Sequence, residues 1–129
     1  MYSNARAVLD TWLTSVNAGE FDAVVSLYHE DAIMLPTFSN RTLTNHQAIR
    51  GYFEQLSHRS GVSVELHEST VRTQHYADHI EGIMGIYRWH FDVEEEPLSF
   101  EARFSMIADL EAAASILHHH SSQVPRELS

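Results

Sequence analysis

A chain of 129 residues predicts a single domain spanning residues 1–129. The chain has no cysteine and no lysine, which excludes disulfides, thiolate chemistry and Schiff-base catalysis on a lysine amine. Its formal net charge of -10 argues against nucleic acid as a partner, because a polyanion requires a cationic surface. No apolar run is long enough for a membrane span, and residues 1–10 lack the pattern of a secretion signal. We therefore expect a cytoplasmic protein that binds neither nucleic acid nor membranes.

The first part of the chain predicts helices. Apolar residues that follow a candidate N-cap, Ser3, recur at helical spacing and stop before Asn17-Ala18-Gly19. A shorter apolar stripe predicts a second helix over residues 21–28. His29-Glu30-Asp31 resembles a metal-binding run, but adjacent residues do not converge easily, so a solvated turn is the better interpretation. Residues 32–36 predict a brief strand.

A third helix has the clearest local signal. Thr44 followed by Gln47 fits a capping box. The apolar stripe of this helix predicts which side chains are buried: Ile49, Tyr52, Phe53 and Leu56. Gly61 ends the region.

The second part of the chain predicts strands. Residues 62–72, 79–91, 98–108 and 115–122 alternate or are bounded in a way that is typical of strands. Gly82 and Gly85 suggest bends or bulges. Residues 92–97 read as an acidic turn and residues 109–114 as a hairpin loop. Helices followed by an antiparallel meander predict an α+β fold, with helices on one face of a curved sheet.

The histidine run in the last predicted strand allows several interpretations. His118 and His120 share one face of a strand, whereas His119 shares the other face with Ser121. A metal site needs a third ligand that no motif supplies, so we expect no metal, and we expect the His118–His120 pair to face solvent, a partner subunit or a sheet contact. His119 is either a buried histidine held by a neighbour or a pocket base, and periodicity does not choose between these.

Two arginines lie in the middle of predicted strands. Arg88 lies between Tyr87 and Trp89, and Arg103 between Ala102 and Phe104. If they point inward, they need a paired anion, and guanidinium groups fit carboxylates well. If they point outward, they pair with nearby glutamates. The residues alone slightly favour the outward alternative.

Four segments together carry a family resemblance: "NAGEFDAVVSLYHEDAIMLP", "HQAIRGYFEQL", "EARFSMI" and "ILHHHSSQVP". The chain resembles the association-domain family of calcium/calmodulin-dependent protein kinase II, and especially its stand-alone bacterial SgcJ/EcaC or SnoaL-like relatives, in the nuclear transport factor two-like superfamily. The resemblance implies a cystatin-like cone, in which a bent antiparallel sheet wraps around three N-terminal helices and leaves a pocket at its open end. It also implies a homodimer formed through the sheet.

The resemblance also implies site residues. The strand arginines of the kinase hub, which hold small carboxylates, match Arg88 and Arg103, and this favours the pocket interpretation for both. The hub's third pocket arginine falls at Ser121 and its helical pocket histidine at Ile49, so the ligand need not be the same. His119 is the residue that we expect to replace the missing donor.

Three functions remain as hypotheses. The first is a homodimeric domain that binds a small organic acid or similar anion, with Trp12, Tyr28, Tyr52 and Ser121 lining the pocket beside the two arginines. The second is a SnoaL-like isomerase, cyclase or hydratase that uses His119 as acid or base, with Tyr28 or Tyr52 as donor. The third is an oligomerisation module. We expect no cofactor, because the chain has no glycine-rich dinucleotide fingerprint.

Overall fold

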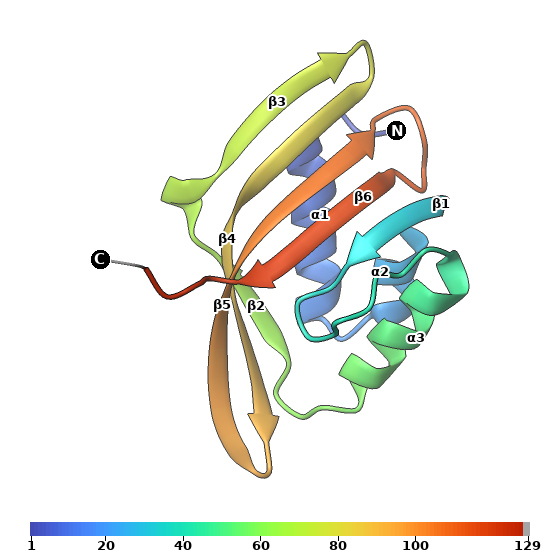
Figure 1. The fold of residues 1–129 in the computed structure, drawn as a ribbon. Coiled ribbons are helices and arrows are strands. Elements are labelled where there is room, and N and C mark those ends of the chain that lie inside the picture. The colour runs from blue at the N-terminus through green and yellow to red at the C-terminus, as the bar shows by residue number, and fades with distance from the viewer. Residues whose placement is uncertain (128–129) are drawn as a thin grey trace.

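The computed structural model describes residues 1–127 and shows an α+β fold, as the sequence predicts. Helices cover one face of a curved sheet (Figure 1). The helices are α1 (Ala5–Asn17), α2 (Phe21–Ser26), α3 (His46–Ser57) and the short 3-10 helix η1 (Glu68–Thr70). The strands are β1 (Tyr28–Leu35), β2 (Ser63–Leu66), β3 (Arg72–Ala77), β4 (Ile80–Val93), β5 (Glu96–Asp109) and β6 (Ile116–Gln123).

The sheet has the strand order β1-β6-β5-β4-β2, and β3 also pairs with β4. β4 and β5 form a long hairpin whose register runs without interruption from Ile80↔Asp109 to Val93↔Glu96. β1 pairs with β6 in parallel, whereas every other pair is antiparallel. The sheet is therefore not the wholly antiparallel meander that the strand pattern predicts. β1 and β6 are joined by no hairpin turn, so no local connection fixes their relative direction.

Asparagine side chains begin both long helices. The N-cap of α1 is Asn4 rather than Ser3, and the N-cap of α3 is Asn45 rather than Thr44. In each case the side-chain Oδ1 accepts a hydrogen bond at 2.8 Å from the backbone N–H three residues later. The expected helices are present, but each N-cap lies one residue after the predicted cap, because asparagine meets the same requirement as serine or threonine.

Both glycines of β4 mark close approaches rather than bulges against β5. A Cβ at Gly82 would lie 2.8 Å from the ring of Tyr76 on β3, and a Cβ at Gly85 would lie 3.3 Å from the backbone of Val71. β4 pairs with β3 before this point and with β2 after it. The hydroxyl of Thr70 accepts the backbone N–H of Ile86 at 2.8 Å, where the neighbouring strand changes.

Three local predictions differ from the structure. The single strand expected over residues 62–72 is divided into β2, η1 and the start of β3. Residues 29–31 lie within β1 and not in a turn, although Glu30 and Asp31 are exposed. The second helix ends at Ser26, and Tyr28 belongs to β1. No helix in residues 1–127 is long and apolar enough to cross a membrane.

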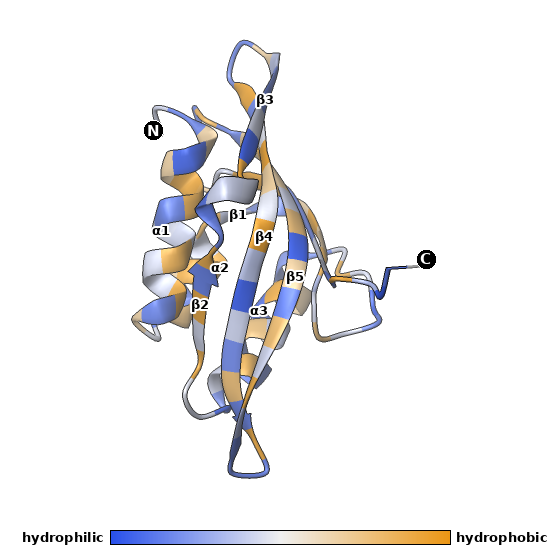
Figure 2. Ribbon diagram, turned by 90° about the vertical axis from the view of Figure 1, so that its left-hand side faces the viewer, coloured by the Kyte–Doolittle hydropathy of each residue, from blue (hydrophilic) through white to orange (hydrophobic). Residues whose placement is uncertain are grey.

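The core lies between the helices and the inner face of the sheet. Hydrophobic and hydrophilic residues alternate along β4 and β5, and α1 lies beside the sheet (Figure 2). The largest side chains with almost no exposed surface come from both layers: Trp12, Trp89, Tyr28, Tyr87, Phe53, Leu9, Ile49, Ile83, Met106, Ile116, His119 and Val8. This alternation defines an inner face that is buried and an outer face that the helices do not cover.

Candidate functional site

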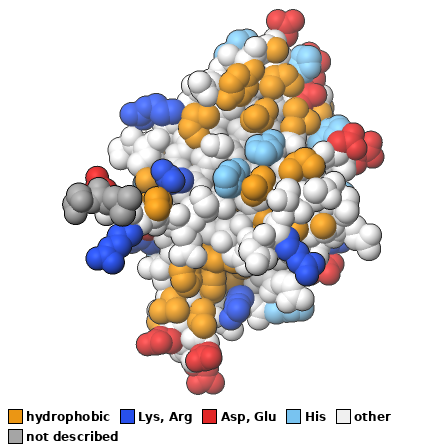
Figure 3. Space-filling view, viewed as in Figure 1, with side chains coloured by type: hydrophobic (Ala, Val, Ile, Leu, Met, Phe, Trp, Pro, Cys, Tyr) orange, Lys and Arg blue, Asp and Glu red, His pale blue; other side chains and the backbone are white. Residues whose placement is uncertain are grey.

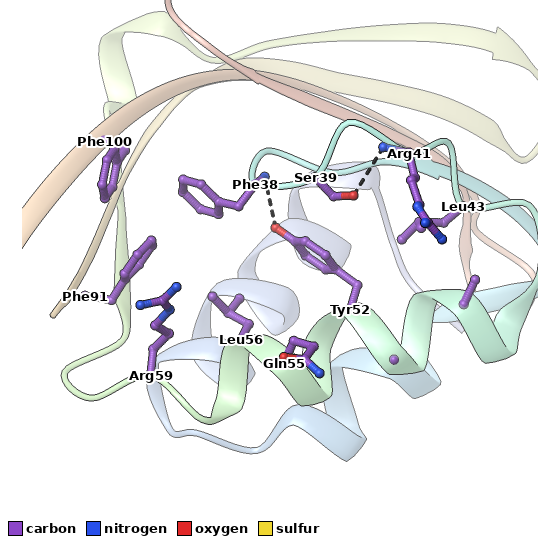
Figure 4. Close-up of a pocket in the computed structure, with 12 residues that line it drawn as sticks. Phe38, Ser39, Arg41, Leu43, Tyr52, Gln55, Leu56, Arg59, Phe91 and Phe100 are labelled. Atoms are coloured by element: carbon purple, nitrogen blue, oxygen red, sulfur yellow. Dashed lines mark hydrogen bonds between the residues drawn. The ribbon is translucent and has the colours of Figure 1, made fainter. Parts of the chain in front are cut away.

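A pocket of about 630 Å³ lies along α3 (Figure 4). Its walls come from α3, from the loop between β1 and α3, and from the distal part of the β4–β5 hairpin. The residues that line it are Phe38, Ser39, Arg41, Leu43, Ala48, Gly51, Tyr52, Gln55, Leu56, Arg59, Phe91 and Phe100. This volume is typical of sites that hold small molecules.

One face of α3 forms the length of the pocket. Ala48, Gly51, Tyr52 and Gln55 recur three or four positions apart, so they follow one another along the same side of the helix. Two of these residues are small, which leaves room above the helix. An added Cβ at Gly51 would meet no atom within 4 Å. The space over Gly51 is therefore open.

One end of the pocket is aromatic. The ring of Phe38 lies edge-on to Phe91 and Phe100, with centroid distances of 5.0 and 5.4 Å, and the latter two rings are stacked at 5.1 Å. The guanidinium group of Arg59 lies over the ring of Phe91, 5.8 Å from its centroid. This cation–π contact holds a positive charge beside an apolar wall.

The two arginines of the pocket have no acidic partner among the described residues. Neither Arg41 nor Arg59 makes an ion pair, although the chain has 18 Asp and Glu residues. By contrast, three other arginines do pair with carboxylates: Arg6, Arg50 and Arg88. Two guanidinium groups that border an apolar pocket can thus accept an anion from outside the chain.

Tyr52 supplies a polar group within the pocket. Its hydroxyl oxygen accepts the backbone N–H of Phe38 at 3.4 Å. Burial raises the pKa of Tyr52 above its ordinary value, so the phenol keeps its proton at neutral pH. The hydroxyl hydrogen has no acceptor among the described residues and is available to a ligand. Of the aromatic residues nominated from the sequence, Tyr52 is the one that lines this pocket.

The pocket contains no histidine, aspartate or glutamate among its described lining residues. Its ionisable side chains are the arginines and Tyr52. An arginine stays protonated, and a tyrosine with a raised pKa is a poor base. The described lining therefore offers hydrogen-bond donors and positive charge, but no group that would remove a proton at neutral pH.

His119 lies in the interior and not in this pocket. Its side chain is fully buried, with Nδ1 2.7 Å from the hydroxyl of Tyr28 and Nε2 3.1 Å from the hydroxyl of Tyr87. The indole N–H of Trp12 donates to the Tyr28 oxygen at 3.1 Å, which leaves the Tyr28 hydroxyl hydrogen for Nδ1. The imidazole hydrogen is then on Nε2 and points to Tyr87.

Burial keeps this imidazole neutral. It lowers the pKa of His119 to about 3, and the charges of His118 and His120 act in the same direction. The alternative of a buried histidine held by neighbours therefore describes His119, and its nomination as a pocket base is wrong. Trp12 and Tyr28 belong to the same buried group and do not line the pocket along α3. Ser121 is buried on the inner face, where its hydroxyl hydrogen-bonds Thr37.

Arg88 and Arg103 lie on the outer face of the sheet. Their neighbours along the strands, such as Tyr87 and Phe104, point inward, so strand alternation turns the arginines outward. The prediction that both project into one sheltered hollow is wrong. Arg88 donates to Glu101 at 2.7 Å, which corresponds to the outward, glutamate-paired alternative.

Arg103 is exposed and makes no ion pair with a carboxylate in residues 1–127. It borders an open groove on the outer face together with His120 and Ser122. The resemblance to the kinase hub therefore identified two arginines that lie on the opposite side of the sheet from the pocket along α3.

A comparison with known protein families assigns residues 5–127 to a SnoaL-like domain. The chain belongs to the SnoaL-like domain family. No curated protein matches the chain. The family placement and the fold inferred from the sequence are thus both confirmed.

Solved structures support the fold of this SnoaL-like chain. A candidate calcium/calmodulin-dependent protein kinase II association domain from Xanthomonas campestris matches with a TM-score of 0.83 and 23% identity, over 95% of this chain and 87% of that chain. PrhC from Penicillium brasilianum NBRC 6234 matches with a TM-score of 0.75 and 22% identity, over 92% and 78%. An NTF2-like protein of unknown function from Pseudomonas putida KT2440 has a TM-score of 0.76 and 15% identity, over 96% and 86%.

The arginines of the SnoaL-like pocket were missed from the sequence. Arg41 lies in a loop and Arg59 follows the end of α3, so neither belongs to a periodic pattern. One sequence feature could have indicated the pocket. Beside the buried apolar stripe, α3 carries a face with small or polar residues, Ala48, Gly51 and Gln55, and this face lines the pocket.

Proposed function

We propose that this SnoaL-like domain binds a small organic acid in the pocket along α3, with Arg41 and Arg59 as the groups that recognise its charge. The observation that carries this proposal is the pair of guanidinium groups, without an acidic partner in residues 1–127, on an otherwise largely apolar pocket of an acidic chain. A free acid in solution meets a net charge of -10, so binding depends on local cations.

The remaining lining suits the rest of such a ligand. Phe38, Phe91 and Phe100 offer apolar surface to a hydrocarbon or aromatic body, since burial of apolar area contributes about 25 cal/mol per Å². Tyr52 offers a hydroxyl hydrogen that the described chain does not use. Apolar walls with a few placed polar groups are the usual arrangement of a small-molecule site.

Binding is better supported than acid–base catalysis. The described pocket lining has no carboxylate or imidazole, and His119, the base nominated from the sequence, is fully buried between two tyrosines. A general base must come within hydrogen-bond reach of the proton that it removes. An isomerase or cyclase using His119 would therefore need the core to open.

Calorimetric titration with octanoate tests the proposal. We expect binding to the wild-type chain, weaker binding to the variants Arg41→Gln and Arg59→Gln, and none to Gly51→Trp, whose indole fills the open space over α3. Arg103→Gln, on the outer face, is the matched control and should bind as the wild type does. Loss of binding in Arg103→Gln alone, or no binding to the wild type, would overturn the proposal.

We also propose that the chain forms a homodimer through the outer face of the sheet. Partly exposed apolar side chains lie there on β1, β4 and β5, including Ile33, Met84 and Ile107. Hydrophobic side chains and histidines gather on this side of the molecule (Figure 3). On the central strands, Arg103 has no carboxylate partner in residues 1–127 and Glu101 pairs with Arg88, which reduces the repulsion between two acidic chains at this face.

Sedimentation velocity tests the homodimer. In a two-fold interface each substituted residue is present twice, so Ile107→Asp should give a monomer. The control Thr73→Asp, on the fully exposed strand β3, should leave the dimer unchanged. A wild-type chain that stays monomeric as its concentration rises would contradict this arrangement.

A further inference from the structure

We propose that the preferred ligand of the pocket carries an acidic group at each end of an apolar body. This inference rests on the proposed function, because it assumes that the pocket along α3 binds organic acids. It adds the substrate class: α,ω-dicarboxylates, or acids of the same elongated, doubly charged shape.

The two arginines lie at opposite ends of the pocket. Arg41 extends from the loop before α3, near Leu43, whereas Arg59 lies beyond the last turn of α3 next to Phe91 (Figure 4). The α3 residues that line the pocket run from Ala48 to Leu56, eight positions later. At 1.5 Å per residue this corresponds to roughly 12 Å along the helix axis, and the two arginines lie beyond the two ends of this stretch. A single small carboxylate does not span this distance.

The section between the arginines is mostly apolar. Phe38, Tyr52 and Leu56 lie there, and the polar side-chain groups of this section are those of Ser39 and Gln55 and the Tyr52 hydroxyl (Figure 4). A carboxylate placed in the middle would lose water without gaining a cation, which is costly. The favourable arrangement puts hydrocarbon in the middle and one carboxylate at each arginine.

The second arginine distinguishes a ligand with two acidic groups from a ligand with one. A ligand with one acid uses one guanidinium group and leaves the other without a partner, whereas a diacid uses both. Both arginines are exposed, so each can reach a carboxylate, and a guanidinium–carboxylate hydrogen bond is stronger than one between neutral groups. The side chain of Arg59 already lies over Phe91, so it loses less conformational freedom when its guanidinium group binds a carboxylate.

A pair of acids with equal carbon number tests the inference. Suberate and octanoate differ in the second carboxylate, and we expect suberate to bind roughly tenfold more tightly to the wild-type chain. Arg41→Gln and Arg59→Gln should each abolish that preference. Arg103→Gln should keep it. Thermal unfolding of all three variants checks that these exposed substitutions leave the fold intact.

The outcomes separate the inference from the proposed function. If octanoate binds as tightly as suberate, the inference is overturned and organic-acid binding stands. If no acid binds, both are overturned. Succinate is too short to reach both arginines, so it should bind much more weakly than suberate. Succinate binding as tightly as suberate would mean that one arginine holds both carboxylates, which also overturns the inference.

Discussion

The hydroxyl of Tyr28 lies 2.7 Å from Nδ1 of His119, in the part of the core that the helices cover. The second tyrosine of this group, Tyr87, lies 3.1 Å from Nε2, so both ring nitrogens of the buried imidazole are occupied. His119 is therefore a structural element that joins β6 to β1 and β4. Its contribution should be visible in stability and not in turnover.

Acid should destabilise the fold through His119. Its folded pKa is about 3, below the ordinary value of 6.5, so the unfolded chain binds more protons between those values. The stability contribution is complete above about pH 6.5 and is lost as the pH falls toward 3. In urea unfolding, the free energy of unfolding of the wild type should fall about 1.4 kcal/mol per pH unit more steeply than that of His119→Gln. Equal slopes would contradict this assignment.

A spectroscopic measurement covers the case in which His119→Gln does not fold. The ring nitrogen shifts of His119 should stay those of a neutral imidazole with hydrogen on Nε2 well below the pKa of an exposed histidine. Neighbouring His118 and His120 lie on the other face of the strand, and their ring signals serve as internal references. Protonation of His119 near neutral pH would contradict the burial of its imidazole between the two tyrosines.

Loss of the Tyr28 hydroxyl should destabilise the core. Tyr28→Phe leaves Nδ1 of His119 and the indole N–H of Trp12 without partners, and a buried unsatisfied polar group costs about 1–3 kcal/mol. Tyr52→Phe removes one long hydrogen bond and should cost less than about 1 kcal/mol, while weakening acid binding. Denaturant unfolding compares the two. A larger loss for Tyr52→Phe would count against the described roles.

Gly51 should be replaceable by alanine with a gain in stability. An added Cβ meets no atom within 4 Å at either Gly51 or Gly19, but Gly19 has a φ of 72°. Gly51→Ala should therefore stabilise α3 by about 0.5–1 kcal/mol, because alanine loses less backbone entropy. Gly19→Ala should destabilise the chain by about 1 kcal/mol, because L side chains disfavour that conformation. The midpoint of thermal unfolding should rise for the first and fall for the second.

Arg88 should contribute little to stability or to acid binding. Its pair with Glu101 lowers the pKa of that carboxyl group, but both side chains are about two-fifths exposed, at 39% and 42%. Exposed pairs contribute little to stability, because water screens their charges. Arg88→Ala should therefore leave the free energy of unfolding nearly unchanged, and it should leave octanoate affinity unchanged in calorimetry. A large loss of affinity would place Arg88 at the site.

The fold was predictable where side chains alternate between core and solvent. The stripes of α1 and α3 and the parity of β4 and β5 carry this signal, because burial repeats with the period of the element. β3 was missed because every one of its residues is exposed, so it has no alternation to detect. The parallel direction of β1 and β6 depends on contacts between the two ends of the chain, which local patterns do not contain.

The candidate site was less predictable than the fold. For the two strand arginines, the alternation of side chains along a strand predicted the direction better than the family resemblance did. Phe104 and Trp89 are apolar and point inward. Because successive side chains of a strand point to opposite faces, their neighbours Arg103 and Arg88 point outward. The resemblance to the kinase hub reversed that interpretation. Arg41 could not be found by parity, because a loop has no repeating face that links residue number to direction.

The central claim is that acids bind beside Arg41 and Arg59. The chain has eight arginines and no lysine, so the side-chain Nε–Hε signals of a ¹⁵N-labelled sample form a small set that can be assigned. On titration with suberate, the signals of Arg41 and Arg59 should shift and saturate together, while those of Arg88 and Arg103 stay in place. Shifts confined to Arg88 and Arg103 would show that the ligand binds on the outer face of the sheet and would contradict the account.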